Sequence, residues 1–203
     1  MDVKDAIRKV MELAPDLKNV SFRDLVEATS EFELHPLDAK LPEDKELIED
    51  LSAAFKHFVA FSSKTGTRFT ATRINDVSRH IEEVLVEQMH KSGLKARILG
   101  ESGYPDIELT DKHNRVSYLE VKISSKQKLT SFRTFYYTSG KKIKSDARHL
   151  LVGLHFSETA DKHWKAEQWE LIDLSKLFVN LKAEFNASNI DIFTEQARIA
   201  KSP

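Results

Sequence analysis

The chain has 203 residues, of which 40% are hydrophobic, so it is long enough to bury its own core and close to the usual length of one domain. It contains no cysteine, which excludes a disulfide framework and a thiolate zinc site and fits a reducing cytosolic setting. The formal net charge of -1 neither favours nor excludes a polyanionic partner.

Helical periodicity dominates the first third of the chain. Apolar residues recur at helical spacing from Val3 to Ala14 and from Phe22 to Thr29, and most strongly from Leu47 to about Phe61. A polar connection follows, so we expect an N-terminal helical region at residues 1–65 and a core at residues 66–203.

The N-terminal segment mixes charged and apolar residues and contains no apolar run long enough for a signal peptide or a membrane span. We therefore expect a soluble cytoplasmic protein that has no membrane partner.

The remainder of the chain predicts an α/β core. A helix is expected from Ile74 to His90, because its apolar residues cluster on one helical face and Gly93 follows its end. Strands are predicted at residues 96–99, 104–110, 116–124, 149–156 and 167–172, and a last helix from Ser175 to about Phe185. The run at 149–156 is almost continuously apolar, which is typical of a strand buried on both faces. This order describes a central mixed β-sheet flanked by helices.

Acidic residues fall on two neighbouring predicted strands. Alternate residues of a strand share a face, so Glu120 and Lys122 point away from their apolar neighbours, as Asp106 does in the strand before. If the intervening turn makes the strands antiparallel, Asp106 and Glu120 can converge on one cation. Mg²⁺ prefers hard oxygen ligands and keeps several waters, so two carboxylates and a backbone carbonyl suffice. A lysine on the same face lies where an attacking water could be oriented or deprotonated.

Pro105-Asp106 followed by Glu120-Val121-Lys122 resembles the PD-(D/E)XK signature of restriction-type nucleases. The resemblance implies a restriction-endonuclease-like fold and a prokaryotic, Mg²⁺-dependent type II restriction endonuclease that leaves 5′-phosphate and 3′-hydroxyl ends. It further implies that Asp106, Glu120 and the Val121 carbonyl bind the metal. By the same resemblance, Lys122 positions the nucleophilic water.

The resemblance also implies a further acid on the helix that precedes the two strands. Glu82 lies nearer the edge of the apolar face of that helix than Glu83, so Glu82 is the preferred candidate for a catalytic role. Glu108 shares the face of Asp106 and either joins the metal shell or stays solvated. No Gly-rich phosphate loop is present, so we expect no nucleotide cofactor.

Basic residues concentrate directly after the signature. From Lys122 to Arg148 the chain carries eight basic residues and one acid, whereas residues 1–60 carry fourteen acids and eight basic residues. One nucleic-acid-facing side would produce this asymmetry, and a solvated basic loop would have the same composition. The residues that we expect to contact double-stranded DNA are Lys126, Gln127, Lys128, Arg133, Lys141, Lys142 and Lys144. A palindromic target would demand a two-fold homodimer.

Other interpretations stay open on sequence alone. A repair or mobile-element nuclease would carry the same core. A DNA-binding module without catalysis is a second alternative, against which the intact set of Asp106, Glu120 and Lys122 argues. A protein whose acidic N-terminal helices mediate interactions would leave the basic segment unexplained. Glu120 and Lys122 could also be a surface ion pair on an edge strand, which their apolar neighbours disfavour.

Overall fold

The computed structural model describes residues 2–13, 17–64, 69–100, 103–125, 135–137, 140–159 and 162–182. The chain divides into two compact units, one formed by Ser21–Phe178 and the other by Met1–Val20 with Val179–Pro203. In the second unit, α1 (Val3–Leu13) is an amphipathic helix without a buried residue. The short strands β1 (Val20–Ser21) and β9 (Phe178–Val179) pair with each other. The predicted division of the chain near residue 65 stays a prediction.

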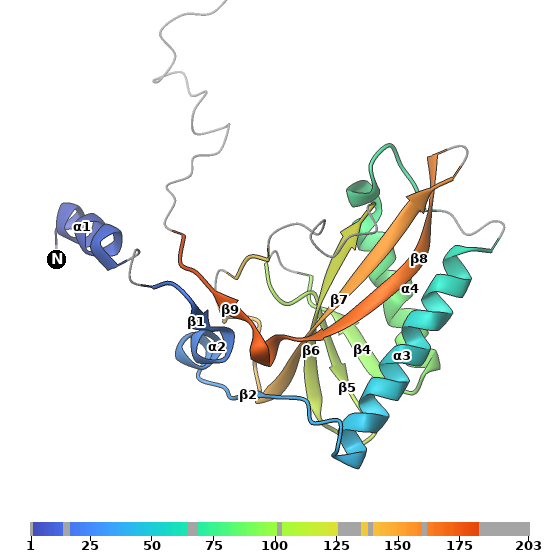
Figure 1. Ribbon diagram of the computed structural model, residues 1–203, viewed down its shortest axis with the longest axis horizontal. Coiled ribbons are helices and arrows are strands. Elements are labelled where there is room, and N and C mark those ends of the chain that lie inside the picture. The colour runs from blue at the N-terminus through green and yellow to red at the C-terminus, as the bar shows by residue number, and fades with distance from the viewer. Residues whose placement is uncertain are drawn as a thin grey trace, which may run out of the picture. The chain divides into compact units, whose positions relative to one another are not determined.

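A mixed β-sheet forms the centre of the unit Ser21–Phe178 (Figure 1). In the described part of the chain it has seven strands in the order β3-β8-β7-β6-β5-β4, with β2 paired to β7 off this path. β7 is parallel to β6 and to β2, and the other pairs are antiparallel. The strands are β2 (Leu34–His35), β3 (Phe69–Thr70), β4 (Lys95–Ile98), β5 (Ile107–Thr110), β6 (Val116–Ser124), β7 (Ala147–Glu158) and β8 (His163–Asp173).

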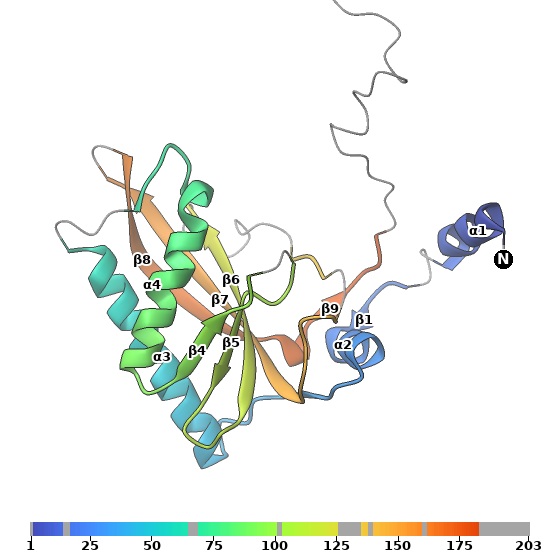
Figure 2. The same ribbon diagram turned by 180° about the vertical axis from the view of Figure 1, so that it is seen from behind.

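Two long helices cover one face of this sheet. The helices α3 (Pro42–Ser62) and α4 (Ser78–Lys91) pack against each other, α3 also against β8 and α4 against β4 (Figures 1 and 2). The 3-10 turn η1 (Ile74–Val77) leads into α4. The core between helices and sheet includes Leu51, Phe55 and Phe58 of α3, Ile81 and Leu85 of α4, and Leu119, Leu150 and Val152 of the sheet. Burial of this apolar surface is the main source of the fold's stability. The predicted flanked mixed sheet of a restriction-endonuclease-like core is confirmed.

The opposite face of β6 and β7 packs against an aromatic cluster. Phe22, at the start of α2 (Phe22–Ser30), lies edge to face with Tyr104 and with Phe135, at centroid distances of 5.5 and 5.2 Å. The Tyr104 hydroxyl and Nδ1 of His149 are 2.6 Å apart. Burial lowers the pKa of His149 to about 3, so this ring is neutral near pH 7. The cluster thus supports the chain immediately before Asp106.

The predicted helix from Ser175 to about Phe185 is wrong in its described part. After the 3-10 turn η4 (Leu174–Lys176), the backbone is extended at Leu177 and continues into β9, while residues 183–185 lie outside the described residues. The Leu177 carbonyl accepts a 2.8 Å hydrogen bond from the amide of Phe22. A hydrogen bond to a distant segment therefore overrides the local helical pattern.

Among the described residues, every helix is too short or too polar to cross a membrane.

Candidate active site

The antiparallel pairing of β5 and β6 sets the position of Asp106. The register pairs Ile107 with Leu119, so Asp106, just before β5, lies beside the β6 residues that follow Leu119. Oδ2 of Asp106 accepts a 2.8 Å hydrogen bond from the Val121 amide. The carboxylate therefore takes the place of a strand carbonyl for an amide that β5 no longer reaches. The structure brings Asp106 and the Glu120–Lys122 segment together.

Glu120 lies in a central strand, and its side chain is 7% exposed. Oε1 of Glu120 lies 2.7 Å from Nζ of Lys122, whose side chain is 19% exposed. The alternative of a surface pair on an edge strand is thereby excluded. Burial raises the pKa of Glu120 to about 7, with a contribution from the charge of Asp106, while Lys122 opposes the rise.

A third acid reaches this place from α4. The side chain of Glu82 is 17% exposed, whereas that of Glu83 is 53% exposed. Burial, and then the charges of Asp106 and Glu120, raise the pKa of Glu82 to about 7. Glu82 is therefore within electrostatic reach of the two strand acids. Glu83 pairs with Arg79 and His80 at the surface of the helix.

The acids fit a hard divalent cation. Burial raises the pKa of Asp106 as well, although the Val121 amide and Lys122 oppose this rise. Within the described residues, the buried Oε2 of Glu120 has no hydrogen-bond partner, which leaves a carboxylate oxygen available to a cation. No three His, Cys, Asp or Glu side chains in the described part of the chain are grouped tightly enough to hold an ion by themselves. A bound ion would need water or a backbone carbonyl, such as that of Val121, as a further ligand.

Glu108 forms an ion pair with a residue of the neighbouring strand β4. It lies directly opposite Arg97 in the pairing of β4 with β5, and its two carboxylate oxygens accept hydrogen bonds of 2.9 and 3.0 Å from that guanidinium group. A bidentate pair of this kind holds both side chains in one geometry. Glu108 is therefore part of a cross-strand ion pair at the sheet surface.

The predicted DNA-contact residues divide into two groups. Lys126, Gln127, Lys128 and Arg133 lie outside the described residues. Lys141 and Lys144 are exposed, and together with Lys142 and the chain from Arg97 to Gly100 they line an open cavity of about 650 Å³. The sequence did not indicate that Arg97 borders the same cavity as the lysines, because β4 is distant from the basic segment in sequence. Only the folded sheet brings the two together.

Lys142 differs from its neighbours in the basic segment. Its Nζ donates hydrogen bonds to the carbonyl oxygens of Gly103 and Pro105, at 2.5 and 2.8 Å. Nothing in the local pattern of the sequence separates Lys142 from Lys141 or Lys144. The contact exists because the segment returns to the chain that leads into Asp106.

Comparisons with known proteins give one consistent result. A family model described as the type II restriction enzyme MjaV family matches residues 15–196. The chain is also 31% identical to the type II restriction enzyme MjaV of Methanocaldococcus jannaschii over 214 residues, which cover 95% of this chain and 91% of that enzyme. The chain therefore belongs to the type II restriction enzyme MjaV family, and with it to the site-specific deoxyribonucleases.

Proposed function

We propose that this protein is a Mg²⁺-dependent restriction endonuclease that hydrolyses phosphodiester bonds of double-stranded DNA and leaves 5′-phosphate and 3′-hydroxyl ends. The observation that carries the proposal is that Asp106, Lys122 and the buried Glu120 come together where β5 and β6 meet. Membership of a restriction enzyme family supports it. A palindromic target would require a homodimer.

In this proposal, Asp106, Glu120 and the Val121 carbonyl hold the metal. The unpartnered Oε2 of Glu120 supports this role, since a buried carboxylate oxygen without a donor is stabilised by a cation. When bound, Mg²⁺ would polarise the phosphoryl group and stabilise the charge that develops on the leaving 3′ oxygen.

Lys122 and Glu82 are assigned to the attacking water. Lys122 is held by Glu120 beside the acids, where its ammonium group can orient a water molecule toward phosphorus. Glu82 lies within electrostatic reach of Asp106 and Glu120, where it would support the attacking water or a second ion. The contrast with the exposed Glu83 supports the choice of Glu82.

The basic residues of the segment after β6 are assigned to DNA. Lys141 and Lys144 border the cavity that opens toward β4, and their exposed ammonium groups suit contact with phosphates. Lys126, Gln127, Lys128 and Arg133 stay predicted contacts from the same segment.

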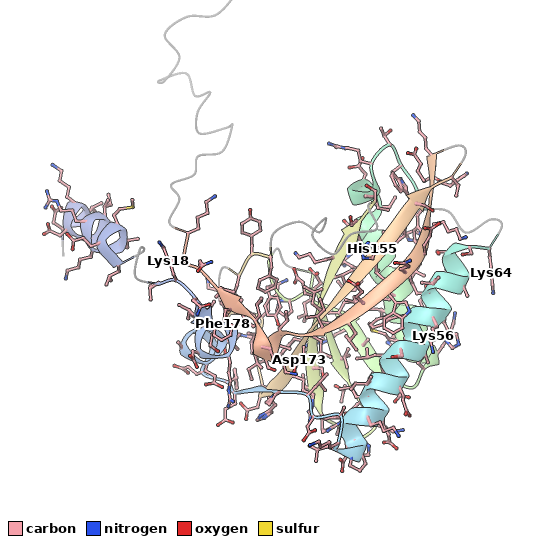
Figure 3. The ribbon with its side chains drawn as sticks, in the orientation of Figure 1. Lys18, Lys56, Lys64, His155, Asp173 and Phe178 are labelled. Atoms are coloured by element: carbon pink, nitrogen blue, oxygen red, sulfur yellow. The ribbon has the colours of Figure 1, made fainter. Side chains whose placement is uncertain are left out.

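The test is to incubate the wild-type protein and Lys122→Ala with mixed-sequence plasmid DNA, in Mg²⁺ or in EDTA, and to sequence the ends of the products. We expect discrete Mg²⁺-dependent fragments that share one short motif, and none from Lys122→Ala. Lys56→Ala, an exposed lysine on α3 (Figure 3), is the matched control and should cleave as the wild type does. Ligation of the ends by a ligase that requires a 5′-phosphate tests the end chemistry. No cleavage of unmodified DNA in any divalent metal would contradict the proposal.

A further inference from the structure

The segment that carries Lys142 is fixed to the protein on both sides of that residue. A Cβ atom added to Gly140 would lie 2.7 Å from the Thr29 carbonyl oxygen and equally close to Cβ of Ser30, so the segment approaches the end of α2 as closely as a glycine allows. Ile143 is buried, at 2% exposure. The amide of Lys144 donates a 2.8 Å hydrogen bond to the Tyr118 hydroxyl. The backbone of Lys142 is therefore placed by packing.

The side chain of Lys142 then binds the chain that ends in Asp106. Its two acceptors, the carbonyls of Gly103 and Pro105, stand on either side of Tyr104, and Pro105 directly precedes Asp106. The carbonyl of Asp106 accepts a 2.8 Å hydrogen bond from the Leu99 amide. The carbonyls of Gly103 and Pro105 accept hydrogen bonds from two of the three N–H groups of the Lys142 ammonium.

We propose that Lys142 is a positioning residue, which holds the Gly103 and Pro105 carbonyls and so keeps the Asp106 carboxylate on the Val121 amide, in the place where it would bind the metal. This replaces the expectation that Lys142 contacts DNA. The functional part of the inference rests on the proposed function, because that function gives Asp106 its role. The structural part does not depend on it.

Electrostatics supports the same assignment. Burial raises the pKa of Asp106 and of Glu120, and the positive charge of Lys142 acts against this rise in both. Lys142 therefore lies within electrostatic reach of both acids, in agreement with its hydrogen bonds to the chain before Asp106. Lys141, its neighbour, is exposed and is the matched control for charge and for position in the chain.

The first test measures the Asp106 contact directly, without metal or DNA. Hydrogen exchange of the Val121 amide, followed by NMR, reports the hydrogen bond that Asp106 accepts. Lys142→Met keeps the length of the side chain but cannot donate, so we expect exchange about tenfold faster than in the wild type. Lys142→Arg should restore most of the protection, and Lys141→Met should leave it unchanged. The amide of Leu51 in α3 controls for general destabilisation.

A second variant reaches the same contact without altering Lys142. Gly140→Ala would push the segment away from α2 and should also accelerate exchange at Val121. It provides the test if Lys142→Met does not fold. Unchanged Val121 protection in the folded variants would overturn the proposal.

The second test separates positioning from DNA contact. Positioning predicts that Lys142→Met lowers kcat for plasmid cleavage at least about tenfold while the KM for DNA stays within about twofold. An increased KM with an unchanged kcat would identify a phosphate contact and overturn the proposal. If the wild type cleaves no DNA, the proposed function fails, and the exchange experiment still decides whether Lys142 positions Asp106.

Discussion

Glu120 and Lys122 form an ion pair with 2.7 Å between Oε1 and Nζ on one face of β6, while Oε2 of the same carboxylate is buried without a partner among the described residues. The pair therefore satisfies only half of the buried carboxylate. An ionised carboxylate in this state lowers the stability of the folded protein when no cation is bound. The ionised Glu120 should therefore lower the free energy of unfolding, and this effect should depend on pH.

Glu120→Gln should become more stable relative to the wild type as the pH rises. The pKa of Glu120 is raised from 4.5 to about 7, so this group stabilises the folded wild type fully below pH 4.5 and loses that contribution as the pH rises through 7. Glutamine does not titrate. We expect the difference in unfolding free energy between variant and wild type to grow by roughly 1–3 kcal/mol in favour of the variant from pH 4.5 to pH 8.

The measurement is urea unfolding at both pH values in EDTA. A difference that does not change with pH would contradict the prediction. Addition of Mg²⁺ at pH 8 should stabilise the wild type and have little effect on the variant.

Glu82→Gln and Glu83→Gln should separate a site residue from its neighbour in sequence. Glu82 is mostly buried beside the strand acids, while Glu83 is at the surface. We expect Glu82→Gln to lower kcat about tenfold or more, and Glu83→Gln to stay within about twofold of the wild type. Single-turnover cleavage at saturating Mg²⁺ is the measurement. Equal effects of the two substitutions would show that the preference for Glu82 is wrong.

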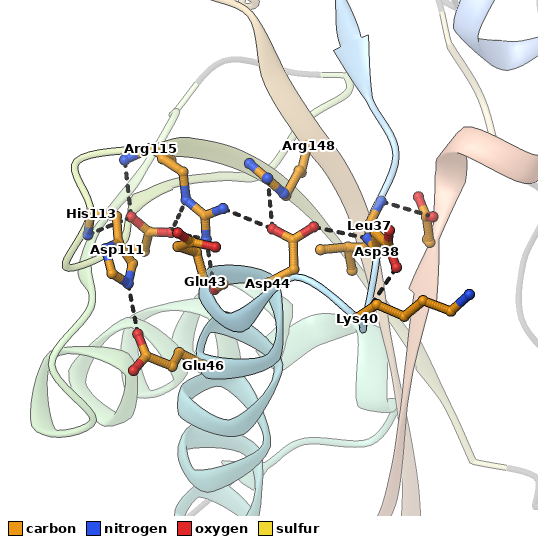
Figure 4. Close-up of polar contacts among 11 residues, drawn as sticks. Leu37, Asp38, Lys40, Glu43, Asp44, Glu46, Asp111, His113, Arg115 and Arg148 are labelled. Atoms are coloured by element: carbon orange, nitrogen blue, oxygen red, sulfur yellow. Dashed lines mark hydrogen bonds and ion pairs between the residues drawn. The ribbon is translucent and has the colours of Figure 1, made fainter.

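Asp44 should matter for stability and not for chemistry. This buried carboxylate at the start of α3 lies 2.8 Å from Nη1 of Arg115 and 2.6 Å from Nη2 of Arg148, and it accepts a 2.8 Å hydrogen bond from the Asp38 amide (Figure 4). Asp44→Ala would remove the buried carboxylate that Arg148 pairs with, while Arg115 would keep its ion pair with Asp111, and the change should cost about 3–5 kcal/mol in unfolding free energy.

The matched control is Glu46→Ala in the same helix, α3. Glu46 is partly exposed and pairs with Lys112 and His113. It should cost less than about 1 kcal/mol. Both values come from denaturant unfolding, and the kcat per folded molecule should stay unchanged in both variants. A loss of kcat in the folded fraction of Asp44→Ala would show that the cluster also supports the site.

Lys141 and Lys144 should contribute to DNA affinity through charge alone. Each phosphate contact that is lost reduces the slope of log K against log salt by about 0.9, so Lys141→Ala with Lys144→Ala should reduce it by about 2. The control removes two exposed lysines, Lys56 of α3 and Lys64 just beyond the end of that helix (Figure 3), and should leave the slope unchanged. Binding is measured with Ca²⁺ in place of Mg²⁺. An unchanged slope in the first double variant would remove these residues from the DNA interface.

The sequence by itself determined the features that depend on local periodicity. The alternation in residues 116–124 placed Glu120 and Lys122 opposite Leu119, because a strand turns successive side chains to opposite faces. The almost continuous apolar run at residues 149–156 predicted a strand buried on both faces, and these residues of β7 are buried. The order of α4 and the strands β4 to β8, and with it the fold class, followed from the same local signals.

Only the tertiary structure decided which distant residues meet. The register of β4 with β5 places Arg97 opposite Glu108. The hydrogen bond between Leu177 and Phe22 holds an extended chain where the sequence pattern predicted a helix. Likewise, Lys142 has the same local chemistry as Lys141, and the packing of Gly140 and Ile143 turns it toward the chain before Asp106. Such contacts depend on loop paths and side-chain packing across tens of residues, whereas periodicity reports only which face of an element is buried.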